Sequence, residues 1–404
     1  EIYTLSLHDA LPIWSAPPEG GVLMPRRLAF FYASVGTGHR VAAEALKEWC
    51  LHEYPDSEVL CRDLLDYVPG WIRWSVVNSY LAMARRSPWL WGELYRGTDA
   101  SSGRRLSGAF WRDVHTSVSR AFLRRLLGDL DRFAPNAIFA THFFGMSSLL
   151  DVWDQHVPIY FVDTDFISHS LQRDPRFAGW FVGSDESVRQ HRADSIPSTE
   201  VTVKNLGIPI SMAYASPLAR EEARDRLSVD ERTRMVLVSG GGIGAGALGT
   251  VADSMLDCTD WRVEIVCGNN KRMFEALRER YYPFKHIIVR RFLGNIRDYY
   301  AASDVVVLKP GGLSAAETLA MGCALLLLDP LPGQERYNCD YLLERGAARR
   351  VYENRRVGEL IKELLESGEE LERMRANARA IGRPFAARDI LRVVMEELDA
   401  DRRG

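Results

Sequence analysis

The chain has 404 residues, of which 47% are hydrophobic and 26% are charged, and its formal net charge is −3. This composition is that of an ordinary globular protein, and the length predicts two domains of roughly 150–200 residues each. The six cysteines are scattered, with no C-x-x-C pair and no local histidine partner, which indicates reduced thiols rather than a disulfide framework or a zinc site. No apolar run reaches the roughly 18 residues that cross a bilayer.

The first 23 residues, EIYTLSLHDALPIWSAPPEGGVL, differ in character from the rest of the chain. They lack the basic start and the continuous apolar core of a secretory signal. A plausible start, MPRRLAFFYAS, begins at Met24. We therefore expect residues 1–23 to be a disordered leader without a function.

The first expected domain spans residues 24–206 and opens with a strand, a glycine turn and a helix. Residues 27–35 are apolar and rich in β-formers, Gly36-Thr37-Gly38 follows, and a helical pattern begins at once. This order is typical of a parallel α/β domain. Further strands are expected at residues 58–61, 137–141, 159–162 and 180–183, and residues 201–210 are expected to cross to the second domain.

The stretch from Tyr67 to Leu127 is basic and rich in tryptophan. It holds ten arginines against three acidic residues, so its net charge is +7, and it contains five of the ten tryptophans. Arginine with tryptophan suits an anionic lipid surface or single-stranded nucleic acid. The same pattern also fits a helix pair with tryptophans in its core. The candidates for membrane contact are Trp71, Trp74, Trp89, Trp91, Arg85 and Arg86.

A second α/β series is expected at residues 207–382. Strands are predicted at residues 235–239, 262–267, 287–289, 305–308 and 324–328, and the first runs into the glycine-rich GGGIGAGALG. Residues 359–398 have a helical pattern, and the part from 383 to 404 could pack back on the first domain. The predicted fold is α/β, with two Rossmann-like doubly wound domains that face a cleft and bind ligands at the carboxyl ends of their strands.

Each expected domain opens on a glycine-rich turn between a strand and a helix. A helix start offers free N–H groups and a partial positive charge, which favour a bound anion. Neither turn is a Walker loop. In the second, the surplus of glycines puts G-x-G-x-x-G spacing (GAGALG, residues 244–249) in the wrong register after the strand, so a tight packing turn is the alternative interpretation of each.

A third helix start follows Pro310-Gly311-Gly312. Glu317 lies four residues past Leu313 and therefore on the same helical face. A carboxylate there could accept hydrogen bonds from the two vicinal hydroxyls of a ribose. It could equally complement the helix dipole, and the spacing does not separate the two.

From about Met24 onward the chain resembles the monogalactosyldiacylglycerol synthase and processive diacylglycerol glucosyltransferase family, relatives of the lipid II synthase. The matching stretches are SVGTGHRVAAEAL, VDTDFISHS, NLGIPI, VSGGGIGAG, CGNN, FLGNIRDYYAASDVVVLKPGGLSAAETLAMG and LPGQERYN with LLERGAA. The resemblance implies the two-domain GT-B glycosyltransferase fold. It also implies an inverting transfer of a hexose from a UDP-sugar to a lipid hydroxyl.

The resemblance assigns donor-site roles. Glu317 would bind the ribose, Phe292 and Leu293 would lie against the uracil, and Gln334 and Glu335 would bind the sugar hydroxyls. The diphosphate would lie against Ser239, Gly240, Gly241, Gly242, Gly311, Gly312, Leu313 and Ser314.

His39 is the candidate base, because an ordinary imidazole pKa suits proton removal near neutral pH and the position matches the histidine of the family's GGGHR motif. Thr37 stands where many relatives have glycine, within the acceptor turn formed by Gly36, Thr37 and Gly38. Asp165 and His169 are expected to shape the acceptor side. The spacing of Asp163 and Asp165 allows a metal interpretation, but the matching family segment is not a metal motif, and no metal is expected.

The expected function is therefore transfer of galactose or glucose from a UDP-sugar to 1,2-diacylglycerol at the cytoplasmic membrane face. The donor is the UDP-hexose, no further cofactor is expected, and the partners are the lipid and an anionic membrane surface rather than nucleic acid. The alternatives are transfer of N-acetylglucosamine to a polyprenyl-linked acceptor, a UDP-sugar epimerase, and a nucleotide-sugar-binding regulator without turnover.

Overall fold

A computed structural model describes residues 26–75, 122–153, 156–193, 202–216, 218–242, 244 and 246–401. The leader and four of the proposed membrane residues lie outside these ranges, so the predictions made for them stay predictions. Those four residues are Arg85, Arg86, Trp89 and Trp91.

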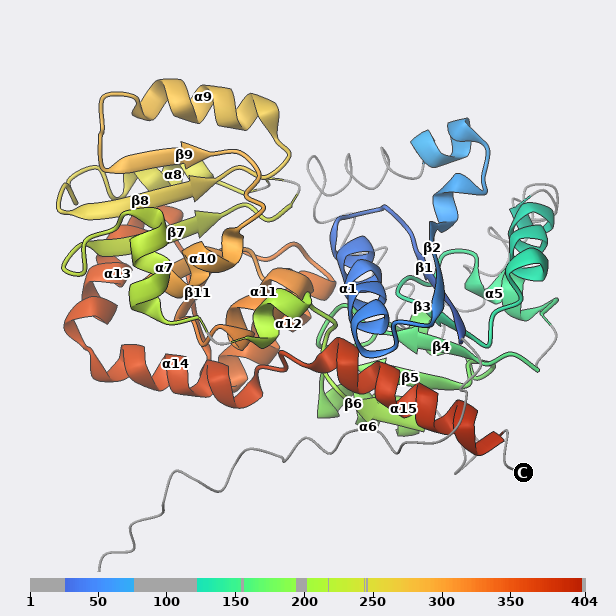
Figure 1. Ribbon diagram of the computed structural model, residues 1–404. Helices are drawn as coiled ribbons and strands as arrows, with labels where there is room; N and C mark the ends of the chain where they lie inside the picture. The colour runs from blue at the N-terminus through green and yellow to red at the C-terminus, as the bar shows by residue number, and fades with distance from the viewer. Residues whose placement is uncertain are drawn as a thin grey trace, which may run out of the picture.

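Two parallel six-stranded sheets form two α/β lobes that lie next to each other (Figure 1). The first sheet has the order β2-β1-β3-β4-β5-β6. Its strands are β1 (Arg27–Tyr32), β2 (Glu58–Asp63), β3 (Ala137–Ala140), β4 (Ile159–Val162), β5 (Gly179–Val182) and β6 (Thr202–Asn205). Every residue of β3, β4 and β5 is buried, as expected for parallel strands with both faces covered.

The second sheet has the order β12-β11-β10-β7-β8-β9. Its strands are β7 (Arg234–Ser239), β8 (Trp261–Val266), β9 (Ile287–Arg290), β10 (Val305–Leu308), β11 (Leu325–Leu327) and β12 (Ala348–Arg350). The sequence did not predict β12, because Ala-Arg-Arg carries no apolar alternation. It also treated residues 201–210 as one crossing, whereas β6 occupies four of them as an edge strand of the first sheet.

Helices connect the strands and cover both sheets (Figure 1). In the first lobe they include α1 (Gly38–Glu53), η1 (Leu64–Asp66), α5 (Met146–Leu150), η2 (Ser170–Gln172) and α6 (Asp185–Ala193), and residues 70–75 and 122–133 are helical too. In the second they are η3 (Met212–Ala215), α7 (Arg220–Leu227), α8 (Leu248–Asp253), α9 (Lys271–Tyr281), α10 (Ile296–Ala302), α11 (Gly312–Ala320), α12 (Gln334–Glu344), η4 (Asn354–Arg356), α13 (Val357–Glu366) and α14 (Glu369–Ile381). None of the helices in the described ranges is both long enough and apolar enough to cross a bilayer.

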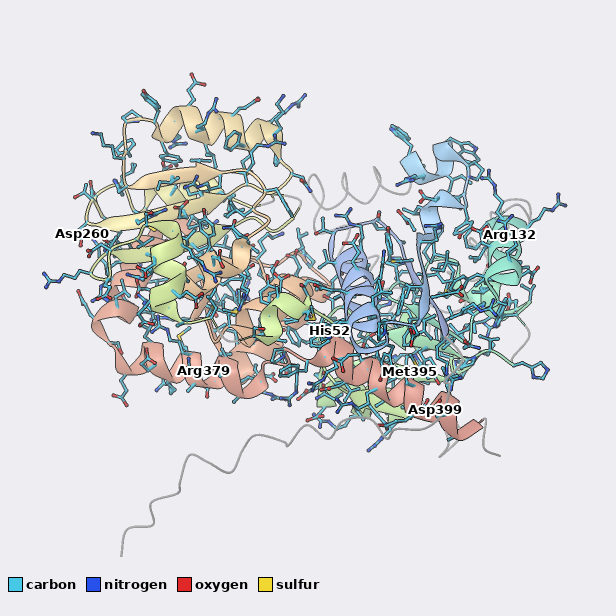
Figure 2. All side chains as sticks on the ribbon, viewed as in Figure 1. His52, Arg132, Asp260, Arg379, Met395 and Asp399 are labelled. Carbon is cyan, nitrogen blue, oxygen red and sulfur yellow. The ribbon has the colours of Figure 1, made fainter. Side chains whose placement is uncertain are left out.

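The last helix, α15 (Ala386–Asp401), leaves the second lobe and packs on the first beside α1 (Figures 1 and 2). Its apolar residues, among them Ile390 and Val394, share a buried cluster with β1, β3 and β4. The Tyr160 hydroxyl donates to Glu397 Oε2 at 2.7 Å, which fixes the helix to β4. The chain therefore ties its two lobes together twice, through residues 206–211 and through α15.

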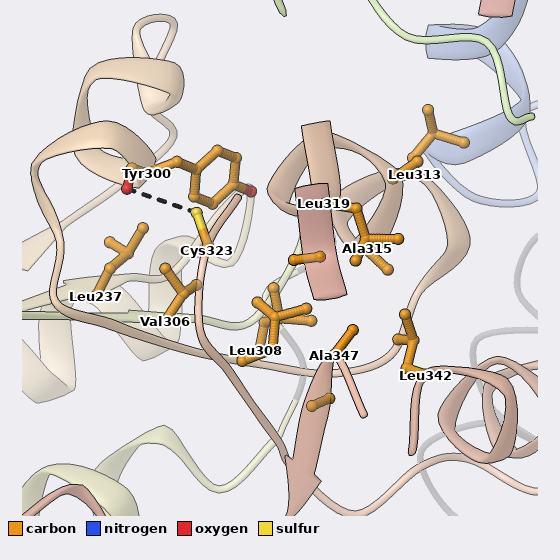
Figure 3. Close-up of a cluster of buried hydrophobic side chains, with 14 of the residues drawn as sticks. Leu237, Tyr300, Val306, Leu308, Leu313, Ala315, Leu319, Cys323, Leu342 and Ala347 are labelled. Atoms are coloured by element: carbon orange, nitrogen blue, oxygen red, sulfur yellow. Dashed lines mark hydrogen bonds between the residues drawn. The ribbon is translucent and has the colours of Figure 1, made fainter. Parts of the chain in front are cut away.

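The helix that carries Glu317 rests on a rigid apolar base. Leu237, Val306 and Leu308 from the strands pack beneath Ala315 and Leu319 of α11 (Figure 3). At one end of this cluster the Cys323 thiol lies 3.6 Å from the carbonyl oxygen of Tyr300. The close packing holds the start of α11 in a defined position against the first lobe.

Candidate active site between the two sheets

The carboxyl ends of both sheets meet through loops that pack almost backbone to backbone. A Cβ atom on Gly312 would overlap the carbonyl group of Thr164, and one on Gly242 would overlap the side chain of Thr37. A Cβ atom on Gly38 would lie 3.4 Å from Leu313 Cδ2. Glycine is required at the first two positions because only a residue without a side chain permits this approach.

His39 lies at the start of α1 and is half-buried in this junction. Its Nδ1 is 2.7 Å from the carbonyl oxygen of Thr141 and 3.0 Å from Thr164 Oγ1. Because a carbonyl can only accept, Nδ1 must carry the proton, and the lone pair of the neutral ring is on Nε2. The ring is therefore oriented as a base would be.

Burial lowers the pKa of His39 to about 4, although its bond to Thr141 acts in the opposite direction. The sequence had suggested an ordinary imidazole pKa, and the structure corrects this. The ring is neutral at physiological pH, which is the form that accepts a proton, but it is a weaker base than a solvated histidine.

Two aromatic residues near His39, namely His142 and Phe143, were not predicted from the sequence. His142 packs edge-on against His39 with 4.5 Å between ring centroids, and Phe143 stacks on His142 at the same distance. Phe143 is 37% exposed. The signal was THFFG directly after the third strand, at the carboxyl edge where ligands bind.

Asp163 and Asp165 take separate partners. Asp163 Oδ2 accepts the hydroxyl of Ser168, while Asp165 Oδ1 accepts Asn338 Nδ2 at 2.7 Å. Burial raises the pKa of Asp163 to about 7 and that of Asp165 to about 6. In the described part of the chain no three acidic, histidine or cysteine side chains converge on a metal position.

His169 is buried and serves the backbone. Its Nδ1 accepts the N–H of Leu171 at 3.1 Å, and it caps the short helix η2. His169 therefore has a structural role, and its predicted contact with the acceptor stays a prediction.

Glu317 is half-buried on α11, with its Oε2 at 3.5 Å from the Tyr300 hydroxyl. Burial raises the pKa of Glu317 to about 7, and hydrogen bonds from Tyr214 and Tyr300 act in the opposite direction. A carboxylate has about four acceptor positions, so two tyrosines leave room for two ribose hydroxyls. Phe292 and the adjacent Leu293 follow β9, and Phe292 is 62% exposed. An exposed ring at this position offers a flat surface for the uracil base.

The glycine turn after β7 is partly occupied by its own hydrogen bonds. Gly240 N–H donates to the carbonyl of Val266 at 3.1 Å, and Gly241 N–H donates to Ser239 Oγ at 3.2 Å. These two N–H groups already have acceptors, so they are poorly available to bind a diphosphate. The start of α11 is the stronger candidate, since the first N–H groups of a helix lack partners within it.

Gln334 and Glu335 begin α12. The Oε1 of Gln334 is buried without a hydrogen-bond partner, which marks it as an acceptor that a ligand hydroxyl could satisfy. Glu335 pairs with Lys309 at 3.0 Å and accepts the N–H of Leu331 at 2.8 Å. Lys309 was not singled out from the sequence, although it stands in the LKPGG stretch. Its side chain lies next to the glycine-rich turn after β7, where a Cβ atom on Gly246 would be 3.6 Å from Lys309 Cδ.

Comparison with known proteins supports the family resemblance. Residues 39–210 match the profile described as monogalactosyldiacylglycerol (MGDG) synthase, and residues 254–381 match glycosyl transferases group 1. Monogalactosyldiacylglycerol synthase 2 of Arabidopsis thaliana is 24% identical over 399 residues, which cover 93% of this chain and 82% of the relative. The processive diacylglycerol beta-glucosyltransferase of Staphylococcus carnosus is 26% identical over 231 residues, and the match covers 57% of this chain and 59% of the relative.

Solved structures confirm the fold. MurG of Acinetobacter baumannii superposes with a TM-score of 0.58 at 16% identity, covering 92% of this chain and all of that one. The UDP complex of MnaA from S. aureus gives a TM-score of 0.62 at 13% identity, covering 93% and 97%. The predicted pair of doubly wound domains in the GT-B arrangement is thus confirmed.

Proposed function

We propose that this chain, a relative of the monogalactosyldiacylglycerol synthases and processive diacylglycerol glucosyltransferases, transfers galactose or glucose from a UDP-sugar to diacylglycerol. The observation that carries the proposal is the meeting of His39 with the start of α11. A neutral imidazole with Nδ1 held by Thr141 lies in the junction where Thr164 touches Gly312. The base and the anion site of a group-transfer reaction are thereby adjacent.

The chemistry follows from this arrangement. His39 Nε2 takes the proton of the acceptor hydroxyl as its oxygen bonds to the anomeric carbon. The bond from that carbon to the diphosphate breaks on the opposite face, so the configuration inverts. UDP leaves with the electron pair, and the helix start at Gly312 stabilises its charge.

The donor site needs no metal in this proposal. The start of α11 and the Lys309 ammonium group supply positive charge for the diphosphate. We expect turnover to survive an excess of EDTA. A loss that Mg²⁺ or Mn²⁺ restores would contradict this part of the proposal and would return attention to Asp163 and Asp165.

The acceptor is proposed to reach the cleft from a membrane surface along the first lobe. Trp71 and Trp74 are 68% and 70% exposed there, with Arg73 between them. Indole rings and arginine suit the headgroup region of a bilayer. The proposed location is therefore the inner face of the cell membrane.

The test is a panel of labelled donors and acceptors. The purified protein would be incubated with UDP-glucose, UDP-galactose or UDP-N-acetylglucosamine over vesicles that contain diacylglycerol or a polyprenyl-linked sugar. We expect a hexosyl-diacylglycerol from one of the first two donors. Transfer only to the polyprenyl acceptor, or UDP-sugar binding with no transfer to either lipid, would contradict the proposal.

A further inference from the structure

Asn338, on α12, is fully buried and joins three segments of the chain. Its Nδ2 donates to Asp165 Oδ1 at 2.7 Å and to the carbonyl of Pro310 at 3.1 Å. Its Oδ1 accepts the N–H of Phe166 at 2.9 Å. Both ends of the amide are thereby used, and two of the bonds lead to the loop at residues 163–166 while the third leads to the turn before α11.

Each of these segments carries a group of the candidate active site. The loop at residues 163–166 belongs to the first lobe, and its Thr164 contacts both His39 Nδ1 and the backbone of Gly312. Pro310 begins the turn into α11. On α12 itself, Gln334 lies four residues before Asn338, and therefore on the same helical face.

A second contact from the same helix strengthens this connection. Tyr341, three residues after Asn338, stacks on Phe166 with 4.6 Å between centroids and an interplanar angle of 11°. Both rings belong to the buried cluster that also holds Leu313. The loop at 163–166 is thus held by α12 through an amide and a ring, and a displacement of α12 would displace the loop.

We propose that Asn338 is a positioning residue that couples the sugar-binding start of α12 to the orientation of His39 through the loop at residues 163–166. The inference rests on the proposed function. Asn338 itself does not reach the reacting atoms. It fixes Thr164, which fixes His39 Nδ1 and packs on the helix start that faces the diphosphate.

A control variant separates positioning from simple attachment of the lobes. Arg345 follows the last residue of α12 and pairs with Glu186 of the first lobe at 2.6 Å. This contact also joins the lobes, but it does not involve the loop at 163–166. Arg345 also lies over the ring of Tyr341 at 4.9 Å from its centroid, so the control removes the other partner of the ion pair. Glu186→Ala should leave kcat within about 3-fold of the parent value, as expected for a partly exposed ion pair.

The main variants are Asn338→Asp, Asp165→Asn and the two combined. Asn338→Asp places two carboxyl groups in contact, and Asp165→Asn replaces the carboxylate that accepts the 2.7 Å bond with a neutral amide oxygen, which is a weaker acceptor. We expect Asn338→Asp to lower kcat by about 10- to 100-fold, the cost of a misplaced catalytic group, and Asp165→Asn to lower it by a smaller factor of about 3-fold or more, with KM for the UDP-sugar within about 2-fold in both. The combination rebuilds an amide–carboxylate bond in the reverse direction, so kcat should recover by about 5-fold or more relative to Asn338→Asp.

A readout without turnover keeps this inference separate from the proposed function. The ring of His39, identified by loss of its NMR signal in His39→Gln, should titrate at a higher pH in Asn338→Asp than in the parent, and the combination should reverse the shift. If the parent transfers no sugar to any lipid, the proposed function fails, while this titration still decides the role of Asn338. An unfolded Asn338→Asp would leave Asp165→Asn and the combination to be compared with the parent.

Three results would overturn the inference. One is an equal loss of kcat in Glu186→Ala and Asn338→Asp, which would mean that Asn338 only attaches the lobes to each other. Another is an unchanged titration of His39 in a folded Asn338→Asp or Asp165→Asn protein. The third is failure of the combination to recover any activity or any of the titration shift.

Discussion

The position of the Glu317 side chain could be predicted from the sequence, but its protonation state could not. The spacing from Leu313 placed it near the helix start, and the structure agrees. Its raised pKa of about 7 comes from burial beside Tyr214 and Tyr300, which are 103 and 17 residues away in sequence. No local pattern connects these residues, so the raised pKa of Glu317 could not be predicted from the sequence.

Replacing Glu317 with glutamine should weaken UDP binding by about 1–3 kcal/mol, because charge-assisted bonds to the ribose hydroxyls are lost. Isothermal titration calorimetry with a UDP-sugar measures this directly. The parent affinity should rise between pH 6 and 8, since Glu317 ionises around its pKa of about 7. Tyr300→Phe should move this rise to higher pH because one hydroxyl bond that lowers the pKa is removed. Equal affinity of parent and Glu317→Gln would remove this residue from the nucleotide site.

His39→Ala should reduce sugar transfer by about 10²–10⁴-fold, the usual contribution of a positioned base. UDP-sugar affinity should stay near the parent value, because the proposed nucleotide contacts lie in the other lobe. With a folded pKa of about 4, the ring is neutral above that value, so kcat at saturating UDP-sugar should rise through about pH 4 and be level from pH 6 to 8. His52→Ala, at the exposed end of the same helix, is the matched control. Near-parental rates in His39→Ala would assign the base to another group.

At the level of elements, the two glycine turns form a single contact across the lobes. Thr37, which departs from the family's glycine, fills the space next to Gly242. The sequence identified the departure, but the partner on the opposite lobe was visible only in the structure.

Gly242→Ala should impair both UDP-sugar binding and transfer, since its methyl group would meet the side chain of Thr37. Adding Thr37→Gly should relieve the overlap, with a coupling energy of about 1–3 kcal/mol in kcat/KM. Gly128→Ala, which meets nothing within 4 Å, controls for the effect of a glycine replacement. Additive effects of the two changes would mean that the turns do not touch in the active protein.

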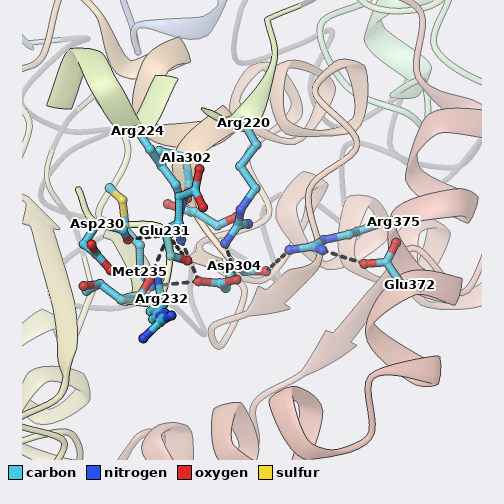
Figure 4. Close-up of polar contacts among 12 residues, drawn as sticks. Arg220, Arg224, Asp230, Glu231, Arg232, Met235, Ala302, Asp304, Glu372 and Arg375 are labelled. Carbon is cyan, nitrogen blue, oxygen red and sulfur yellow. Dashed lines mark hydrogen bonds and ion pairs between the residues drawn. The ribbon is translucent and has the colours of Figure 1, made fainter. Parts of the chain in front are cut away.

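A buried ion pair fixes α7 to the second sheet. Arg224 is 2% exposed and donates to Asp304 Oδ2 at 3.0 Å and to four backbone carbonyls (Figure 4). Asp304 also accepts the N–H of Met235 at 2.8 Å, next to the start of β7. The pair thus links a helix, a strand and a loop below the donor site.

Asp304→Ala should destabilise the second lobe by about 3–5 kcal/mol, because the guanidinium group of Arg224 would remain buried without its counter-charge. Urea unfolding followed in the presence and absence of UDP would report this loss. Asp260→Ala, at an exposed turn, should change stability by less than about 0.5 kcal/mol. Equal losses of stability in the two variants would show that the buried Arg224–Asp304 pair contributes no more than an exposed residue does.

The strands were predictable wherever an apolar run was buried on both faces. The predicted ranges 159–162 and 305–308 coincide with β4 and β10, and most others differ by one or two residues at an end. The exceptions are edge strands. Neither β6 nor β12 is fully buried, so hydrophobic patterning carries little information there.

At the scale of the whole molecule, the sequence predicted two lobes and a cleft but not the contacts that close it. Asn338, Lys309 and His142 act through partners in segments distant along the chain. Such contacts depend on how the lobes pack, which periodicity and spacing do not encode. The packing also suggests which lobe meets the membrane, because the exposed tryptophans of the described residues lie together at residues 71–74.

Replacing both Trp71 and Trp74 with alanine should lower partitioning onto anionic vesicles by about 10-fold or more, since two large exposed side chains would no longer enter the headgroup region. Sedimentation with vesicles at low salt measures the partitioning, and raising the salt should weaken only the share due to arginine. UDP affinity should be unchanged. Tyr282→Ala is the control, because Tyr282 is 86% exposed but belongs to the second lobe. Equal sedimentation of the parent and the double variant would place the membrane contact elsewhere, whereas an equal loss in Tyr282→Ala would mean that both lobes touch the surface.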